Sequence, residues 1–295
     1  MKQASKKVPV RVEGRDLVLT NLGKVLYPEA GFAKAEVIDY YSRVAPVLLP
    51  HLRGRPLTVK RYPDGVGGMF FFEKNAPRHT PDWVRTVRLP APGSTKNRET
   101  IDFAVVDDLP TLVYYANLAA LELHVPQWRV SADGEALPPD TLVFDLDPGP
   151  PATIVECCRV ALTLREVLDA EGLTALPKTS GNKGMQLYAG WDCREEPSAY
   201  ARRLARALES RHPDEVVSVM ARKARPGKVF IDWSQNNPAK TTVAPYSLRA
   251  GPRPTVSTPL LWEEVEGCER PADLVFTAPD VLARIGEHGD LFRRA

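Results

Sequence analysis

The segment Leu-Val-Phe-Asp-Leu-Asp-Pro-Gly at residues 142–149 constrains the fold more than any other part of the chain. Its apolar residues predict a strand, which the following prolines end sharply. Side chains two apart in a strand share a face, so Asp145 and Asp147 project together while Phe144 and Leu146 face the core. Two adjacent carboxylates repel each other unless a cation lies between them, and such oxygen ligands suit Mg²⁺ or Mn²⁺. A pair of exposed acids ahead of a turn is the alternative interpretation.

A third acid, Asp232, ends another apolar strand that we expect near residues 228–233. Alone, this residue is as consistent with a turn as with a metal ligand. Together with Asp145 and Asp147, it completes the carboxylate set of a two-metal phosphoryl-transfer site. In such a site one ion activates the attacking hydroxyl and the other steadies the triphosphate and the leaving group. The three acids therefore predict a metal-dependent nucleotidyltransferase.

A glycine-containing loop at residues 178–184 is a candidate phosphate-binding element. Its two glycines flank Lys183, and Ser180 precedes them. Such a loop can turn its backbone N–H groups toward a phosphate while the lysine supplies positive charge. The spacing of a Walker A loop is absent. A simple hairpin turn is the alternative.

Basic, imidazole and aromatic side chains add further candidates. His124 could donate a hydrogen bond to a triphosphate oxygen, although a lone histidine is more often structural. Lys60 and Arg61 alternate in a predicted strand at 57–62, so one of them points inward or toward a cleft. Among the three phenylalanines at 70–72, we expect at least one to be an exposed stacking platform for bases and at least one to pack in the core.

Composition limits the classes of protein that this chain can belong to. The 295 residues are 43% apolar and 26% charged, as in globular proteins, and no run of 18 apolar residues predicts a membrane span. No signal sequence is expected, and the four cysteines lack zinc-site spacing, so we expect a cytoplasmic protein. A net charge of +2 excludes a polycation. Nucleic-acid binding would thus depend on local basic clusters.

Periodicity along the chain favours one α+β domain at residues 9–295, after a flexible tail at 1–8. Strands and helices interleave without the regular alternation of a doubly wound parallel sheet. A polar loop is expected at 93–99, and Thr153 with Glu156 predicts a capping box at the start of a helix. Strands are expected at 10–19 (a hairpin around Gly14), 57–62, 69–73, on both sides of the polar loop within 84–107, and at 141–147, 174–179, 185–189, 216–221 and 228–233; helices are expected at 34–48, 109–123, 153–171, 198–211 and near the C-terminus.

Eight motifs follow one another in an order that identifies a family. They are Leu-Gly-Lys-Val-Leu-Tyr-Pro (22–28), Val-Ile-Asp-Tyr-Tyr (37–41), Phe-Phe-Glu-Lys (71–74), His-Val-Pro-Gln-Trp (124–128), Val-Phe-Asp-Leu-Asp-Pro (143–148), Thr-Ser-Gly-Asn-Lys-Gly (179–184), Val-Phe-Ile-Asp-Trp-Ser-Gln-Asn (229–236) and Lys-Thr-Thr-Val-Ala-Pro-Tyr-Ser-Leu-Arg (240–249). From about Asn21 to Trp262, the chain resembles the polymerase domain of bacterial ligase D, a branch of the archaeo-eukaryotic primase superfamily.

The resemblance implies an α+β fold with a primase-like catalytic core, in which helices flank mainly antiparallel sheets. It implies a DNA repair polymerase of non-homologous end joining, which fills gaps and extends DNA ends and prefers ribonucleotides. Two divalent ions, Mn²⁺ or Mg²⁺, would serve as cofactors. The implied partners are gapped or broken DNA with a 5′-phosphate, nucleoside triphosphates, the Ku protein and a DNA ligase, in the bacterial cytoplasm at the nucleoid.

The resemblance also assigns roles to particular residues. The sequence departs from it at Gln186, where many relatives carry a histidine, and at Asn182, where they often have Ser or Gly. The polar loop at 93–99 lies where the family has a loop implicated in bringing two DNA ends together. The implied metal ligands are Asp145, Asp147 and Asp232; the nucleotide contacts are Lys60, His124, Ser180, Lys183, Gln235 and Arg249; the 5′-phosphate pocket is Asn21, Lys24 and Lys34; and Phe71 and Phe72 pack against the template.

Two other functions are open at this level. A primase that starts strands without a primer would use the same three aspartates, and primer-free synthesis on single-stranded DNA would distinguish it. A module that only binds and pairs DNA ends belongs to another class, and the intact set of aspartates argues against it.

The first prediction separates an enzyme from a binding module. The double substitution Asp145→Ala and Asp147→Ala should abolish nucleotide incorporation, because it removes the metal ligands, and should leave DNA binding in place. Primer extension and a DNA-binding titration measure the two properties. Undiminished incorporation by this variant would refute the enzymatic interpretation.

Overall fold

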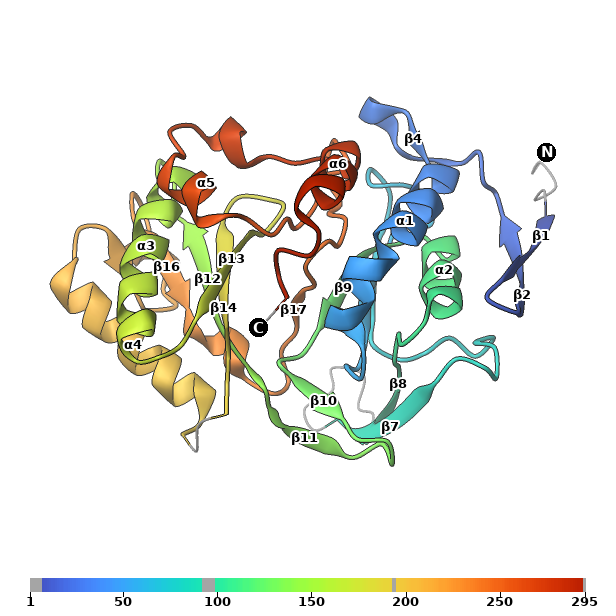
Figure 1. Cartoon of the computed structure of the whole chain (residues 1–295), viewed down its shortest axis with the longest axis horizontal. Helices are drawn as coiled ribbons and strands as arrows, with labels where there is room; N and C mark the ends of the chain where they lie inside the picture. The colour runs from blue at the N-terminus through green and yellow to red at the C-terminus, as the bar shows by residue number, and fades with distance from the viewer. Residues whose placement is uncertain (1–6, 92–98, 193–194, 294–295) are drawn as a thin grey trace.

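Two sheets organise the computed structural model, which describes all residues except 1–6, 92–98, 193–194 and 294–295. The first has the strand order β13-β14-β12-β16-β15 and the second the order β17-β9-β5-β6. Figure 1 shows the first sheet with α3 and α4 in one part of the molecule, and α1, α2 and β9 in the other. Within the described residues, every strand pair is antiparallel except β15 with β16.

The elements have the following bounds. The first sheet contains β12 (Thr141–Pro148), β13 (Ala175–Thr179), β14 (Met185–Gly190), β15 (Val216–Val217) and β16 (Val229–Asp232), and the second contains β5 (Thr58–Arg61), β6 (Phe71–Glu73), β9 (Ala120–Val125) and β17 (Thr242–Val243). Four two-stranded pairs are β1 (Lys7–Val12) with β2 (Arg15–Thr20), β3 (Val25–Tyr27) with β4 (Phe32–Ala33), β7 (Thr86–Pro90) with β8 (Thr100–Ala104), and β10 (Trp128–Val130) with β11 (Ala136–Pro139). The helices are α1 (Lys34–Leu52), α2 (Leu109–Asn117), α3 (Ile154–Ala170), α4 (Pro197–Arg211), α5 (Trp262–Glu266) and α6 (Ala278–His288), and the 3-10 turns are η1 (Pro28–Ala30), η2 (Arg222–Ala224), η3 (Trp233–Asn236) and η4 (Pro271–Leu274).

Strand β12 separates two hydrophobic cores. Its residues Leu142, Phe144 and Leu146 pack into the core beneath α3 and α4. Val143 points the other way, into the core that α1, α2, β5 and β9 form. Because strand side chains alternate, Asp145 and Asp147 continue the face of Val143. The prediction that both acids share the face opposite Phe144 and Leu146 is therefore consistent with the packing.

The capping box predicted from Thr153 and Glu156 is confirmed at the start of α3. The Thr153 hydroxyl accepts from Val155 N at 3.2 Å, and the Glu156 carboxylate accepts from Thr153 N at 2.7 Å. These bonds satisfy N–H groups that a helix start leaves unpaired. Cys157 and Cys158 are buried on the inner face of α3, as small packing residues.

One predicted helix is wrong in its second half. Residues 109–123 were expected to be helical, but α2 ends at Asn117 and β9 begins at Ala120. Ala119 breaks the helix with a left-handed φ of 58°. All six residues of β9 are buried within the second sheet. An apolar run that is buried on all sides shows no period, so the sequence pattern alone did not separate helix from strand.

Two smaller expectations also need correction, and a third lies almost wholly outside the described residues. The strand expected at 216–221 covers only β15, because Val219 and Met220 turn outward and are each 46% exposed. The expected tail at 1–8 lies outside the described residues up to residue 6, whereas Lys7 and Val8 belong to β1. The loop expected at 93–99 lies outside them except for Glu99. The described residues contain no helix that is both long and apolar enough to cross a membrane.

The second prediction concerns the buried side of β12. Leu142 is fully buried, so Leu142→Ala should lower the free energy of unfolding by about 2–5 kcal/mol. Denaturant unfolding measures the change. Leu137→Ala is the matched control, because Leu137 lies on β11 with 44% of its surface exposed. Similar losses in both variants would contradict the assigned core.

Candidate active site

A row of polar side chains crosses four strands of the first sheet at one level. Asp145 on β12 lies opposite Gln186 on β14 and opposite Asp232 on β16. Gln186 in turn lies opposite Lys178 on β13. Directly opposed residues in antiparallel strands have Cβ atoms about 4.5–5.5 Å apart. The sheet therefore places two of the three predicted acids next to each other, and Asp147 follows on the same face of β12.

Hydrogen bonds hold this row in place. Gln186 Nε2 donates to Asp145 Oδ1 at 3.0 Å, and its Oε1 accepts from Lys178 Nζ at 2.5 Å. Lys178 also donates to Ser257 Oγ at 2.6 Å. On the other side, Asp232 accepts from Ser234 N at 3.0 Å and from Gln235 Nε2 at 2.9 Å. Gln235, predicted to contact the nucleotide, is thus held against Asp232 here.

Like charge and burial dominate the electrostatics of the three acids. Burial and the neighbouring Asp147 raise the pKa of Asp145 to about 7, although Gln186 acts in the opposite direction. Burial and the charge of Asp232 raise the pKa of Asp147. Burial also lowers the pKa of Lys178 well below its ordinary value, and the charge of Asp145 opposes that shift. The positive charge of Lys178 is therefore too small to balance the negative charge of the three acids.

This donor set fits a divalent cation. Carboxylate oxygens are the preferred ligands of Mg²⁺ and Mn²⁺, and a cation between the acids would relieve their repulsion. In the described part of the chain, no three His, Cys, Asp or Glu side chains are already gathered to hold a metal ion. Asp145 and Asp232 are instead hydrogen-bonded to Gln186, Ser234 and Gln235. These hydrogen bonds orient the acids and do not exclude a cation, because carboxylates that bind a metal also accept hydrogen bonds.

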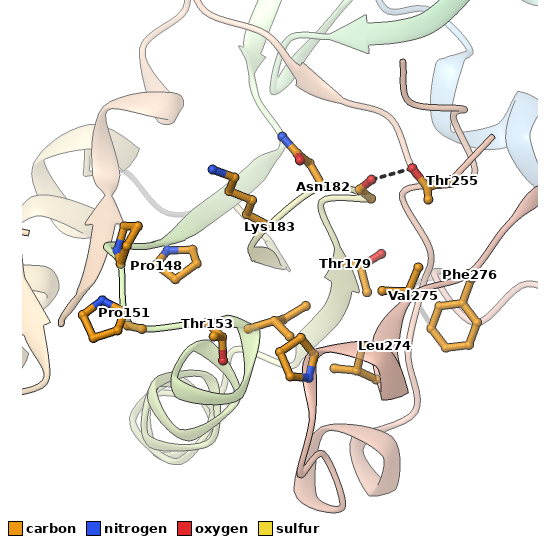
Figure 2. Close-up of a pocket in the computed structure, with 15 residues that line it drawn as sticks. Pro148, Pro151, Thr153, Thr179, Asn182, Lys183, Thr255, Leu274, Val275 and Phe276 are labelled. Carbon is orange, nitrogen blue, oxygen red and sulfur yellow. Dashed lines mark hydrogen bonds between the residues drawn. The ribbon is translucent and has the colours of Figure 1, made fainter. Parts of the chain in front are cut away.

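The predicted glycine loop connects β13 to β14 beside these acids. Ser180 Oγ accepts from Asn182 N at 3.3 Å and from Gly184 N at 3.2 Å, so this hydroxyl organises the loop. Lys183 and Asn182 line a cavity of about 410 Å³ whose floor is mostly apolar (Figure 2). Thr255 Oγ1 donates to the Gly181 carbonyl at 2.8 Å, and Figure 2 draws this bond as a dashed line at Thr255.

Close backbone approaches fix the position of the loop. A Cβ on Gly184 would lie 2.0 Å from the Leu146 carbonyl oxygen, so the loop rests directly on β12. Gly181 has a φ of 70°, and a Cβ there would lie 2.6 Å from Arg249 Cγ. The loop therefore contacts both the strand of the acids and a predicted nucleotide-binding arginine.

Three predicted nucleotide-binding residues meet at one buried carboxylate. Glu122 Oε2 lies 3.3 Å from Lys60 Nζ, 2.9 Å from His124 Nε2 and 3.6 Å from Arg249 Nη1. Burial acts to raise the pKa of Glu122, but the hydrogen bond with His124 and the two cations lower it to about 2. Burial lowers the pKa of His124. Arg61, by contrast, pairs with Glu73, so Lys60 is the cation of β5 that joins this cluster.

The residues predicted for a 5′-phosphate also lie together. Asn21 has a left-handed φ of 54°, and its carbonyl accepts from Lys24 N at 2.9 Å. Lys24 Nζ pairs with Asp64 at 2.6 Å. Lys34 is 5% exposed and donates to the Thr20 carbonyl at 2.6 Å. Burial, then the charges of Lys24 and Arg61, lower the pKa of Lys34 to about 8.

The phenylalanine triplet differs from its prediction. Phe70, Phe71 and Phe72 are 53%, 45% and 49% exposed, so none of them packs in the core as expected of at least one. They lie on or next to β6, the edge strand of the second sheet. This edge strand pairs with β5 on one side only. The Phe72 ring approaches the His124 ring at 6.2 Å between centroids, which connects the aromatic surface to the cation cluster.

Sequence reasoning missed three members of the site. Glu122 precedes His124 by two residues and shares its strand face on β9, but the helix expected over 109–123 hides that spacing. Lys178 begins the glycine motif, whose pattern assigns it no role. Gln186 differs from the family pattern, and that difference alone predicts no contact for it. Its hydrogen bonds to both Asp145 and Lys178 depend on strand register, which a single sequence does not specify.

Comparisons with known proteins identify the family of the chain. A model of the family "LigD, primase-polymerase domain" matches residues 33–292. The multifunctional non-homologous end joining protein LigD of Mycolicibacterium smegmatis is 43% identical, covering 92% of this chain and 35% of that protein. The bifunctional non-homologous end joining protein LigD of Bacillus subtilis is 33% identical, covering 92% of this chain and 43% of that protein. This chain therefore spans less than half the length of these relatives.

A solved structure shows the same fold. The polymerase domain from Mycobacterium tuberculosis ligase D in complex with DNA is 41% identical to this chain. It matches with a TM-score of 0.86 and covers 93% of this chain and 96% of that one. The α+β fold and its carboxylate-bearing sheet thus define a nucleotidyltransferase of the primase-polymerase type. More specifically, the chain belongs to the family of LigD primase-polymerase domains, which confirms the resemblance found in the sequence.

The third prediction tests the contact between the glycine loop and β12. Gly184→Ala should reduce nucleotide incorporation at least tenfold, because its Cβ would collide with the Leu146 carbonyl and displace the loop from the acids. Gly190→Ala is the matched control on the same hairpin, since nothing lies within 4 Å of a Cβ there. Incorporation rates and unfolding temperatures of both variants measure the effect. Full activity in Gly184→Ala would show that the loop position is unimportant.

Proposed function

We propose that this domain, residues 9–295, is the repair polymerase of a non-homologous end-joining system, which fills gaps and extends DNA ends. The observation that carries the proposal is the juxtaposition of two unlike clusters. One contains Asp145, Asp147 and Asp232, and the other contains the cations around Glu122. A nucleoside triphosphate needs both, since its phosphates are anionic and their transfer needs metal-bound carboxylates.

In the proposed reaction, Asp145, Asp147 and Asp232 would hold two divalent ions, Mg²⁺ or Mn²⁺. When bound, these ions would activate the primer 3′-hydroxyl and neutralise charge on the triphosphate. The side chains of Gln186 and Gln235 would help to orient the acids through their hydrogen bonds to Asp145 and Asp232. The oxygen-only donor set supports Mg²⁺ or Mn²⁺ and does not distinguish between them.

The protein's own cations would bind the incoming nucleotide. Lys60, His124 and Arg249 would contact triphosphate oxygens, and Lys183 would add charge from the glycine loop, which the Ser180 hydroxyl shapes. Gln235, which lies beside Asp232, would be a further contact. The preference for ribonucleotides is supported by the family resemblance. In this scheme the exposed rings of Phe71 and Phe72 stack against the template.

Recognition of the DNA end would fall to Lys24, Lys34 and Asn21. Lys34 is held beside two other cations although it is buried, an arrangement that is costly without an anion and that a 5′-phosphate would relieve. The M. tuberculosis domain was solved in complex with DNA, and the relatives' names place them in end joining, which supports DNA as the substrate. Ku, a DNA ligase and a location at the bacterial nucleoid complete the proposal.

The fourth prediction tests this function on a gapped duplex. The wild-type domain should extend the primer across the gap, with ribo- or deoxynucleotides and with Mg²⁺ or Mn²⁺, and should favour a 5′-phosphate over a 5′-hydroxyl at the far side. Lys24→Ala and Lys34→Met should lose this preference but keep extension on unphosphorylated gaps, because a phosphate contact adds affinity without reading bases.

Lys7→Ala serves as the control for general loss of positive charge, since Lys7 is exposed on β1. Circular dichroism establishes that each variant is folded. A wild-type domain that incorporates no nucleotide under any of these conditions would refute the polymerase function. Lysine variants that still prefer phosphorylated gaps would refute only the placement of the phosphate pocket.

A further inference from the structure

Glu122 is a buried acid at the centre of the proposed triphosphate-binding surface. It lies on β9 and is 2% exposed. Lys60 lies directly opposite it on β5, His124 follows two residues later on the same strand face, and Arg249 arrives from the segment after β17. Glu122 Oε1 also accepts from Ala250 N at 3.1 Å, which ties the carboxylate to the backbone beside Arg249.

The Glu122 side chain is more deeply buried than each of its three partners. The Glu122 side chain is 2% exposed, whereas those of Lys60, Arg249 and His124 are 27%, 16% and 11% exposed. The carboxylate therefore lies behind the three nitrogen-bearing groups, on the side away from solvent. An incoming anion would meet the cations first and would not displace Glu122.

The single negative charge of Glu122 does not neutralise the cations that it contacts. Lys60 and Arg249 carry two positive charges against one negative charge, so positive charge remains for a ligand. Arg249 Nε is buried, and within the described residues it has no hydrogen-bond partner. A buried donor without a partner is costly. In the part of the chain that the structure describes, Glu122 therefore leaves part of the hydrogen-bonding capacity of its cations unsatisfied.

We propose that Glu122 is a positioning residue, which gathers Lys60, His124 and Arg249 into one triphosphate-binding surface before the nucleotide arrives. This inference rests on the proposed function. Without the carboxylate, Lys60 and Arg249 would repel each other, and the His124 ring would lose the group that fixes its orientation. Holding the cations together in advance reduces the ordering cost of binding. Arg249 also packs on Gly181, so the same carboxylate supports the glycine loop.

The fifth prediction follows from this role. Glu122→Gln keeps the shape and removes the charge, and it should raise the KM for ATP about tenfold, or roughly 1.4 kcal/mol, with kcat changed less than about twofold. The measurement is primer extension on a gapped duplex with a templating thymine, at varied ATP. Binding of the gapped DNA, which the cluster does not contact in the proposed scheme, should be unchanged.

Two further variants make the test specific. Glu73→Gln is the matched control, because Glu73 forms the ion pair with Arg61 on the same sheet and should leave the KM unchanged. In an Arg249→Ala background, Glu122→Gln should raise the KM much less than tenfold, since one of the cations that it positions is gone. A general loss of stability would instead affect both backgrounds equally.

Each result of these measurements either supports or overturns the proposal. An unchanged KM in Glu122→Gln would overturn the proposal, and so would a lowered KM, which would show that Glu122 competes with the nucleotide for the cations. If Glu122→Gln does not fold, Glu122→Asp carries the test: a raised KM with an unchanged unfolding temperature supports positioning, and a wild-type KM refutes it. Because each comparison needs an active wild-type domain, failure of the polymerase function itself would be seen separately, as absent incorporation.

Discussion

Repulsion between carboxylates at the centre of the first sheet is the constraint around which the rest of the site is arranged. The register of β12 sets Asp145 opposite Asp232, with Asp147 on the same face. Isolated buried charges of one sign would destabilise the fold. Lys178, fully buried two strands away, offsets part of this charge through Gln186, and hydrogen bonds around η3 offset another part.

The second cluster has an excess of the opposite charge and is stabilised in the same way. Around Glu122 the excess charge is positive, and one buried carboxylate holds the cations together. Each cluster thus contains one residue of opposite charge. That residue reduces the repulsion among the other charges but does not neutralise them. The remaining excess is negative beside β12 and positive beside β9. A nucleoside triphosphate with bound metal ions would be complementary to this separation. Its metal ions would face the negative excess beside β12, and its phosphates would face the positive excess beside β9.

The sequence specified the local parts of this arrangement better than the contacts between strands. Alternation was sufficient to put Asp145 and Asp147 on one face, and Thr153 with Glu156 marked the start of α3. The pairing of Asp145 with Asp232 joins residues far apart in the chain, so the sequence pattern made Asp232 a candidate ligand without placing it opposite Asp145. Periodicity failed at β9, where burial on all sides hides the strand period, and with it the significance of Glu122 was lost.

The exposed run from Met69 to Phe72 has a consequence for handling the protein. Met69 and Phe70 precede the edge strand β6, and Phe71 and Phe72 belong to it. Together these exposed side chains form an apolar surface to which another chain can add, a feature that soluble proteins usually avoid. In the proposed function, these rings stack on nucleobases. Selection for solubility or expression yield would therefore favour polar replacements at these positions. In the proposed function, the soluble variants obtained in this way would bind the template weakly.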